Sequence, residues 1–167
     1  MFAFETPFLD LEIYRLVSIL AVSPALAEFE GSESDKRRLE FLRNWERPEV
    51  SRIVVSLAAI IRSSLDAHSV GGGFYTGTLE GEALARQVGT LFPDEGNPHL
   101  KEPLCFREAC NKVLHADRVD FETKAVPSAA PAPLTGRLIL YGRRSKKEWR
   151  AELDLKEYAS SALALTP

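Results

Sequence analysis

A long amphipathic pattern in the middle of the chain limits its fold more than any other feature. Between residues 49 and 68, large apolar side chains recur at steps of three and four, which is the spacing of one face of an α-helix. The apolar positions are Val50, Ile53, Val54, Leu57, Ile60, Ile61 and Leu65. Polar residues such as Arg52, Ser63 and Asp66 lie mainly elsewhere on the same helical wheel. We therefore expect a core helix here, against which other segments pack.

Helical spacing also marks four further segments. Apolar residues follow it near residues 9–20, 39–42, 82–92 and 104–118. Pro24 falls where the first of these segments is expected to end or break, and Pro48 suits the first turn of the core helix. The first two thirds of the chain therefore predict a bundle of four to five helices.

The period of the pattern changes near the C-terminus. Residues 137–142 and 148–155 alternate between apolar and polar side chains, and the charged sequence RRSKK at 143–147 separates them. Trp149, Ala151, Leu153 and Leu155 share one face of the second segment. Because an isolated hairpin is barely stable in water, we expect a β-hairpin over 137–155 whose apolar face packs on the helices.

These patterns predict one α+β domain over residues 1–167. It is mainly a helical bundle over 1–118, followed by an extended, proline-rich connector at 127–136, the hairpin at 137–155 and a short helix at 156–165. Asp154 and Glu157 resemble a capping box for that last helix. A chain of 167 residues with 45% hydrophobic content is long enough to build one core.

The net charge of −3 conceals an uneven distribution. Residues 1–100 carry 9 Lys and Arg against 15 Asp and Glu, whereas residues 101–150 carry 11 against 6. A basic segment of this kind attracts phosphates. The alternative is that the basic face pairs with the acidic half of the same chain.

The cysteines and the N-terminal segment indicate a cytoplasmic protein without a membrane span. Cys105 and Cys110 are the only two cysteines, which is not a disulfide framework and favours a reducing compartment. The apolar run at 16–27 follows acidic residues rather than a positive leader, so we interpret it as part of a mature helix. It is also too short to span a bilayer.

The polar residues of segment 104–118 are the strongest candidates for chemistry. On a helical wheel, Arg107, Asn111, His115 and Arg118 fall within about 80° of one another, beside a core face that contains Phe106 and Cys110. An imidazole moves protons near neutral pH, an arginine holds a phosphate, and an amide orients either group. The alternative is an ordinary solvated stripe beside a core face.

The sequence CNKVLHA at residues 110–116 resembles the motif of HEPN domains, which are small helical bundles. That motif is an arginine, a polar residue that is often asparagine, three variable residues and a histidine. Asn111 matches its polar position and His115 matches its histidine, whereas Cys110 stands where the family has arginine. Arg107, one turn earlier, is the candidate that could replace that arginine.

The resemblance implies a function and an oligomeric state. Many HEPN proteins are metal-independent ribonucleases in which two protomers form a composite site, and others are binding or scaffolding modules. It therefore implies a homodimer in which the Asn111 and His115 stripes face each other across the two-fold axis. In such a site His115 would be the general acid or base, Asn111 would orient it, and Arg107 or Arg118 would steady the phosphate.

The turn of the predicted hairpin is a second candidate site. Arg143, Arg144, Lys146 and Lys147 place four cations in five residues, which suits binding to a nucleic-acid backbone. Tyr141 and Trp149 flank the turn and carry rings on which bases can stack. The alternative is that these charges only prevent aggregation of the hairpin edge.

Metal and nucleotide sites are not expected. His99, Cys105, Cys110 and His115 are potential zinc ligands, but steps of five residues on one helix turn their side chains in different directions. The glycine run at 71–73 lacks the Lys-Ser/Thr pair of a phosphate-binding loop. We therefore predict no metal and no cofactor.

Two main functional hypotheses follow from the sequence. The first is a HEPN-like protein that binds RNA and acts as a metal-independent ribonuclease if its site is complete. The second is a non-enzymatic interaction or assembly protein. A small-molecule sensor with a pocket between helices and hairpin is a further alternative.

Overall fold

The computed structural model describes residues 6–69, 79–125, 131–145 and 147–165. The glycine run at 71–73, the first part of the expected connector at 127–136, and Lys146 lie outside these residues. The helices and strands follow in the order α1 (Thr6–Ala27), α2 (Glu33–Arg43), α3 (Glu46–Ser69), α4 (Leu79–Ala85), β1 (Gln87–Phe92), β2 (Glu102–Cys105), α5 (Phe106–Leu114), β3 (Arg118–Thr123), β4 (Leu134–Arg144), β5 (Lys147–Asp154) and α6 (Leu155–Leu163).

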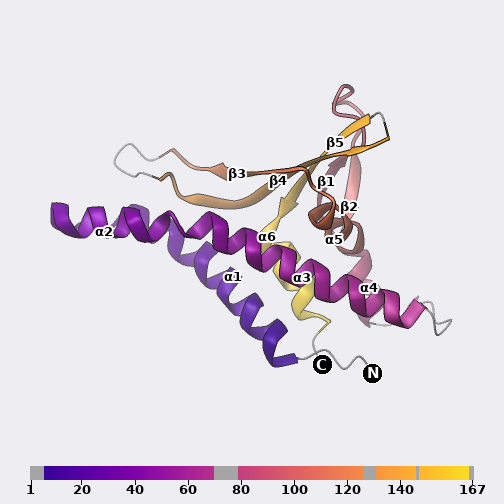
Figure 1. The fold of residues 1–167 in the computed structure, drawn as a ribbon, viewed down its shortest axis with the longest axis horizontal. Helices are drawn as coiled ribbons and strands as arrows, with labels where there is room; N and C mark the ends of the chain where they lie inside the picture. Colours follow the sequence, from indigo (N-terminus) through magenta and orange to yellow (C-terminus); the bar gives the residue numbers. More distant parts are fainter. Residues whose placement is uncertain (1–5, 70–78, 126–130, 146, 166–167) are drawn as a thin grey trace.

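One antiparallel sheet contains all five of these strands. Its order is β2-β1-β5-β4-β3, so the hairpin of β4 and β5 lies in the middle of the sheet. The helices lie on one side of the sheet, and no described helix covers the other side (Figure 1). We call the uncovered side the open face of the sheet.

This sheet contradicts the expected architecture, in which a helical bundle over 1–118 carried only a C-terminal hairpin. The hairpin is present, but it is flanked on one edge by β1 and β2 and on the other edge by β3. The physical reason is that a two-stranded hairpin leaves both of its edges unpaired and buries little apolar surface. Strands β1 and β3, from earlier in the chain, pair with these two edges, and β2 extends the sheet beyond β1.

The segment 82–92, expected to be helical, divides into the end of α4 and the strand β1. Leu84, Val88 and Leu91 have helical spacing, but the chain leaves the helix after Ala85. Gly89 explains the strand, because a Cβ atom at this position would overlap the carbonyl oxygen of Glu152 on β5. The glycine lets two backbones approach closely, and this tertiary pairing overrides the helical pattern.

The segment 104–118, also expected to be one helix, contains parts of three elements. β2 ends at Cys105, α5 ends at Leu114, and β3 begins at Arg118. His115 is the C-terminal cap of α5, with φ −114° and ψ 13°. The helix therefore has nine residues, and Arg118 does not belong to it.

The hydrophobic core fills the space between the sheet and the helices. From α3 it takes the apolar face that the sequence predicts, including the fully buried Val50, Ile53, Leu57 and Ile61. Strands β4 and β5 contribute the alternate residues Leu138, Leu140, Trp149, Ala151 and Leu153. Helix α6 begins at its cap Asp154, whose carboxylate accepts hydrogen bonds from the backbone of Lys156 and Glu157.

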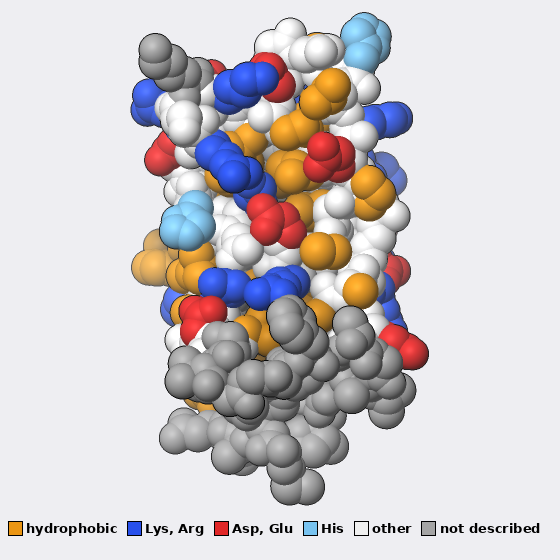
Figure 2. All heavy atoms as spheres, turned by 90° about the vertical axis from the view of Figure 1, so that its right-hand side faces the viewer, with side chains coloured by type: hydrophobic (Ala, Val, Ile, Leu, Met, Phe, Trp, Pro, Cys, Tyr) orange, Lys and Arg blue, Asp and Glu red, His pale blue; other side chains and the backbone are white. Residues whose placement is uncertain are grey.

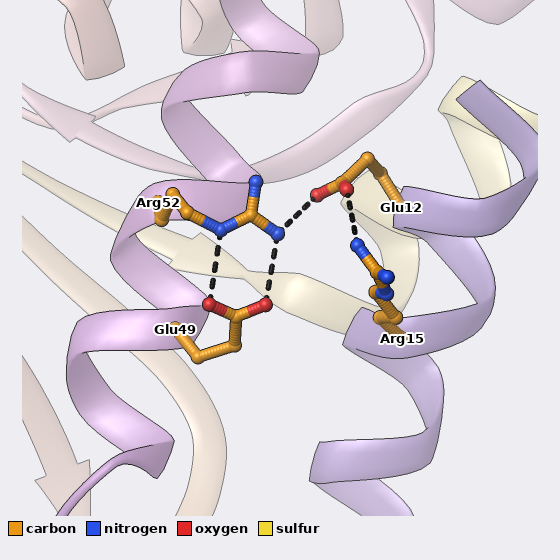
Figure 3. Close-up of polar contacts among 4 residues, drawn as sticks. All are labelled: Glu12, Arg15, Glu49 and Arg52. Atoms are coloured by element: carbon orange, nitrogen blue, oxygen red, sulfur yellow. Dashed lines mark hydrogen bonds and ion pairs between the residues drawn. The ribbon is translucent and has the colours of Figure 1, made fainter. Parts of the chain in front are cut away.

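Helix α1 continues through Pro24 to Ala27 and packs on α3. Four charged side chains join the two helices (Figure 3). Glu12 is fully buried and accepts hydrogen bonds from Arg15 at 3.0 Å and from Arg52 at 2.8 Å, and Arg52 also pairs with Glu49. None of the described helices combines the length and the apolar character needed to cross a bilayer.

A second polar cluster lies where α1, α2, α3 and β4 meet. The hydroxyl of Ser23 donates a hydrogen bond to Glu46 at 2.7 Å and accepts one from the backbone N–H of Leu134 at 3.1 Å. The buried Arg43 lies 3.7 Å from the same Glu46 carboxylate. This cluster fixes the position at which β4 enters the sheet.

Candidate functional site

The residues of the expected helical stripe lie on different elements. Arg107 and Asn111 are one turn apart on α5, His115 ends that helix, and Arg118 is the first residue of β3. Arg118 pairs with Tyr141 in the sheet and so lies on its open face. A single helical stripe of four residues therefore does not form.

The three remaining residues do not form a connected polar group. Asn111 Nδ2 donates a hydrogen bond to the Glu108 carboxylate at 2.9 Å. Among the described residues, no hydrogen bond or ion pair joins the side chains of Arg107, Asn111 and His115 to one another. Arg107 and His115 are exposed, and Asn111 is half-buried. Figure 2 shows the side of the molecule on which α5 lies, with charges of both signs among apolar side chains.

Cys110, which stands where HEPN domains have arginine, points into the core. Its Sγ lies 3.6 Å from the hydroxyl of Tyr158 on α6, and both residues are fully buried. Burial raises the pKa of the Cys110 thiol to about 12 and raises the pKa of Tyr158 as well. A residue at this position cannot contact a substrate phosphate, so the motif arginine has no counterpart on this turn of the helix.

The basic turn between β4 and β5 reaches solvent, and its described cations have carboxylate neighbours. Lys147 Nζ lies 2.9 Å from Asp94, and this hydrogen bond lowers the pKa of Asp94. Arg143 Nε lies 3.7 Å from Asp117. Arg144 is exposed at the same turn. The turn is therefore accessible, but its charge is partly neutralised.

The most regular arrangement on the open face is a row of four side chains that crosses four strands. The register places Phe92 opposite Arg150, Arg150 opposite Tyr141, and Tyr141 opposite Arg118. The Arg150 guanidinium lies 4.2 Å from the centre of the Phe92 ring, and the Arg118 guanidinium lies 3.8 Å from that of Tyr141. We call Phe92, Arg150, Tyr141 and Arg118 the aromatic–arginine row.

The two aromatic residues that flank the basic turn lie on opposite faces of the sheet. Tyr141 is half-buried on the open face, where its ring is part of the row. Trp149 is only 3% exposed and lies on the helix side, with Lys112 Nζ 4.4 Å from its ring centre. Of the two, only Tyr141 lies on the open face, and the Arg118 guanidinium lies over its ring.

Carboxylates accompany most arginines of the open face. Arg118 lies 3.4 Å from Asp120, Arg137 lies 3.5 Å from Glu122, and Arg150 lies 3.1 Å from Glu152. The basic segment thus pairs largely with its own acidic residues. The ion pair of Lys147 with Asp94 connects it to the acidic first hundred residues.

A small pocket lies beside Arg118 and Tyr141, between the row and the basic turn. Its volume is about 160 Å³, below the roughly 300–1,000 Å³ of typical ligand sites. The polar side chains that line it belong to Glu95, Asp117, Arg118, Tyr141, Arg143 and Glu148. A group the size of one phosphate or one small side chain fits this volume, but a cofactor does not.

Metal-ligating residues do not converge in the described ranges. No group of three or more His, Cys, Asp or Glu side chains there is arranged to hold a metal ion. Cys105 is half-buried, Cys110 is buried, and both are free thiols. Around α5 and the open face, the exposed groups include guanidinium and ammonium groups, carboxylates and the imidazole of His115.

Sequence reasoning missed two members of the aromatic–arginine row. Arg150 alternates with the apolar residues Trp149 and Ala151, but the alternation alone does not show which residues lie beside it on the neighbouring strands. Phe92 was missed because residues 82–92 have helical spacing. The signal that could have found it is the pair of β-branched residues Val88 and Thr90, which favour a strand, on either side of Gly89.

Comparison with known proteins adds no relative. No family model, no curated protein and no solved structure matches this chain. The resemblance to HEPN domains therefore stays an expectation that rests on Asn111 and His115. The functional argument depends on the side chains described above.

Proposed function

We propose that the open face of the sheet binds single-stranded RNA. The observation that carries the proposal is the aromatic–arginine row across four strands, in which the Arg150 guanidinium lies over the Phe92 ring and the Arg118 guanidinium lies over the Tyr141 ring. Open sheet faces of this kind bind single strands by stacking bases on aromatic rings and arginine planes. Each stacked base is worth about 1–3 kcal/mol.

The ion pairs of the open face do not prevent phosphate binding. Arg118 is 61% exposed and its partner Asp120 is 52% exposed. Exposed pairs of this kind contribute only about 0–1 kcal/mol, so an arginine can exchange its carboxylate for a phosphate at little cost. The same pairing removes most of the net positive charge, and we therefore expect modest affinity with clear salt dependence.

The basic turn extends the proposed surface along the strand. Arg143, Arg144 and Lys147 follow Tyr141 and precede Arg150 at the tip of the hairpin, close to the pocket. Lys146 belongs to the same turn in the sequence. In this proposal the turn holds the backbone phosphates while the row holds the bases.

RNA binding is tested by fluorescence anisotropy with a labelled single-stranded oligoribonucleotide over a series of salt concentrations. Tyr141→Ala is expected to weaken binding roughly tenfold through lost stacking. Arg118→Gln is expected to weaken it and to reduce the salt slope by roughly 0.7. The matched control is Arg86→Gln, because Arg86 donates a hydrogen bond to Ser160 of α6 on the helix side of the sheet.

Two results would reject RNA binding at this face. One is the absence of binding at low salt by the wild-type protein. The other is binding that Arg86→Gln weakens as much as Arg118→Gln does. Unfolding curves of the variants show whether a loss of binding only reflects a loss of fold.

Ribonuclease activity is a separate step of the proposal and depends on His115. This imidazole is exposed at the end of α5, three residues before Arg118 of the row. If RNA is cleaved in the presence of EDTA, His115→Ala should abolish cleavage and leave binding unchanged. Cleavage that survives this substitution would exclude His115 as the general acid or base.

A non-enzymatic interaction protein is the second candidate. The observation that favours it is the close pairing of arginines and carboxylates on the open face, which suits a polar protein partner as well as a nucleic acid. Failure to bind RNA at low salt, with the fold intact, would favour this function. We also propose a cytoplasmic location, because the only two cysteines, Cys105 and Cys110, do not form a disulfide framework.

A further inference from the structure

The small pocket beside the aromatic–arginine row contains more carboxylates than guanidinium groups. Its lining includes the carboxylates of Glu95, Asp117 and Glu148 and the guanidinium groups of Arg118 and Arg143. All five residues are exposed, so a ligand can reach them from solvent. An excess of carboxylates repels a phosphate and favours groups that donate hydrogen bonds. The pocket therefore suits a different part of an RNA strand from the part that suits the basic turn.

Glu148 and Arg143 lie next to each other at this pocket. The register places them directly opposite each other on β5 and β4, where Cβ atoms are about 4.5–5.5 Å apart. Each stands two residues from a member of the row, Arg150 on β5 and Tyr141 on β4, so both side chains are on the open face. Among the described residues, the Glu148 carboxylate has no hydrogen bond or ion pair, which leaves both of its oxygens available to a ligand.

Backbone hydrogen bonds fix the segments on either side of the hairpin at this pocket. The Glu95 N–H donates to the carbonyl oxygen of Glu148 at 2.8 Å. On the other side, the Asp117 N–H donates to the carbonyl oxygen of Tyr141 at 2.7 Å. The Asp117 carboxylate also lies 3.7 Å from Arg143 Nε. Both segments are thus tied to the central strands, which lowers the cost of ordering the pocket when a ligand binds.

We propose that this pocket recognises guanine in single-stranded RNA, an inference that rests on the RNA binding proposed above. Proteins that bind single strands read bases by hydrogen bonds to their Watson–Crick edges. On that edge guanine has two adjacent donors, N1–H and N2–H, followed by the acceptor O6. A carboxylate beside a guanidinium offers the complementary pattern of two acceptors and a donor. Glu148 accepts from N1–H and N2–H, and Arg143 donates to O6.

The size and position of the pocket agree with recognition of one base edge. Its volume of about 160 Å³ is below that of typical ligand sites and suits the edge of a base rather than a whole nucleotide. Arg118 and Tyr141 belong both to the row and to the lining of the pocket, so a base held by the row has one edge at the pocket. Adenine, cytosine and uracil each have only one donor group on this edge, which leaves one carboxylate oxygen without a partner.

The first test compares bases at one position by fluorescence anisotropy. The probes are labelled nonamers of uridine with a single central test base, at one salt concentration. The wild-type protein is expected to bind the guanosine nonamer roughly tenfold more tightly than the nonamers with adenosine, cytidine or uridine. Inosine lacks the N2 amino group and N1-methylguanosine lacks the N1 hydrogen, so both should lose most of this preference. 7-Deazaguanosine is the matched control, because its Watson–Crick edge is unchanged, and it should bind as guanosine does.

The second test changes the pocket. Glu148→Gln replaces two acceptors by one acceptor and one donor, so it should remove most of the guanosine preference without weakening binding of the all-uridine nonamer. Glu122→Gln is the matched control, because Glu122 is a carboxylate of the open face that pairs with Arg137 and does not line the pocket. It should keep the preference. Thermal unfolding checks that both variants are folded.

The outcomes separate this inference from RNA binding itself. A guanosine preference that the two modified bases and Glu148→Gln remove, and that Glu122→Gln keeps, supports it. Salt-dependent RNA binding with equal affinity for all four bases overturns guanine recognition and leaves RNA binding standing, and so does a preference that survives Glu148→Gln. Absence of RNA binding at low salt overturns both. An arginine-rich peptide that binds where RNA does not, and that Glu148→Gln weakens, overturns both in favour of a protein partner.

Discussion

Arg52 Nη2 lies 2.8 Å from Oε2 of Glu12, a carboxylate with no solvent exposure, and so connects α3 to α1. The two residues differ in what they lose on separation. Arg52 is 43% exposed and can be solvated by water, whereas Glu12 cannot. The buried carboxylate therefore depends on its arginines more than the arginines depend on it.

This asymmetry predicts unequal effects of mutation. Glu12→Leu removes the buried charge and leaves two solvated arginines, so it should change the free energy of unfolding by less than about 1 kcal/mol. The double variant Arg15→Leu, Arg52→Leu leaves an uncompensated buried carboxylate and should cost about 3–5 kcal/mol. Urea unfolding measures the change in the free energy of unfolding for both variants. Arg47→Leu is the control, because Arg47 is an exposed arginine. Equal losses for the two variants would contradict the prediction.

The pairing of Glu49 with Arg52 predicts a contribution to stability that is lost in acid. The hydrogen bond from Arg52 lowers the pKa of Glu49 below its ordinary value of 4.5. Its folded-state pKa is thus below its unfolded-state pKa, so the pair stabilises the fold above about pH 4.5 and this contribution is lost as the pH falls through the folded-state value. The Tm of the Glu49→Gln variant should therefore fall less than the Tm of the wild type as the pH is lowered. Glu40→Gln on α2 is the control and should follow wild type.

The burial of Cys110 predicts an unreactive thiol. Because its pKa is raised to about 12, very little thiolate is present at about pH 8. Iodoacetamide should modify the half-buried Cys105 in the native protein and modify Cys110 only after unfolding. Mass spectrometry of peptides from native and denatured samples measures this. Rapid native labelling of Cys110 would show that the α5–α6 contact opens easily.

The close approach of β1 to β5 predicts a strict requirement for glycine. Gly89→Ala places a methyl group on the Glu152 carbonyl oxygen and should cost about 1–3 kcal/mol or more, because a backbone must move. Gly96→Ala is the control, since its Cβ would meet only the side chain of Asp94 at 3.3 Å. Thermal unfolding of both variants compares them. Similar stability of the two would mean that β1 and β5 separate without cost.

Strong local patterns allowed part of the fold to be predicted. The apolar face of α3 and the alternation from Trp149 to Leu155 both belong to segments that bury one side against the core. Burial on one side gives a regular spacing of apolar residues, which is visible in the sequence. The strand β3 has no such period, because it is an edge strand in which Arg118, Val119 and Asp120 are all exposed. β2 has only four residues, including Pro103, and is too short to show a period.

The candidate site was harder to predict because its members come from different strands. The helical wheel placed Arg118 beside His115 only on the assumption that one helix continues through both. No glycine or proline stands between them to end the helix, so the sequence gives little warning of the break. The pairing of Tyr141 with Arg118 and Arg150 depends on strand register, which local patterns leave open.

The central position of β5 has a consequence for synthesis of the chain. On the ribosome, β1 and β2 emerge long before the strand that joins them to β4, so an unfinished chain exposes two strand edges with apolar residues. Nascent chains stalled before residue 147 should therefore bind chaperones and be degraded by proteases. Translation speed across the last third of the message would then influence the yield of folded protein.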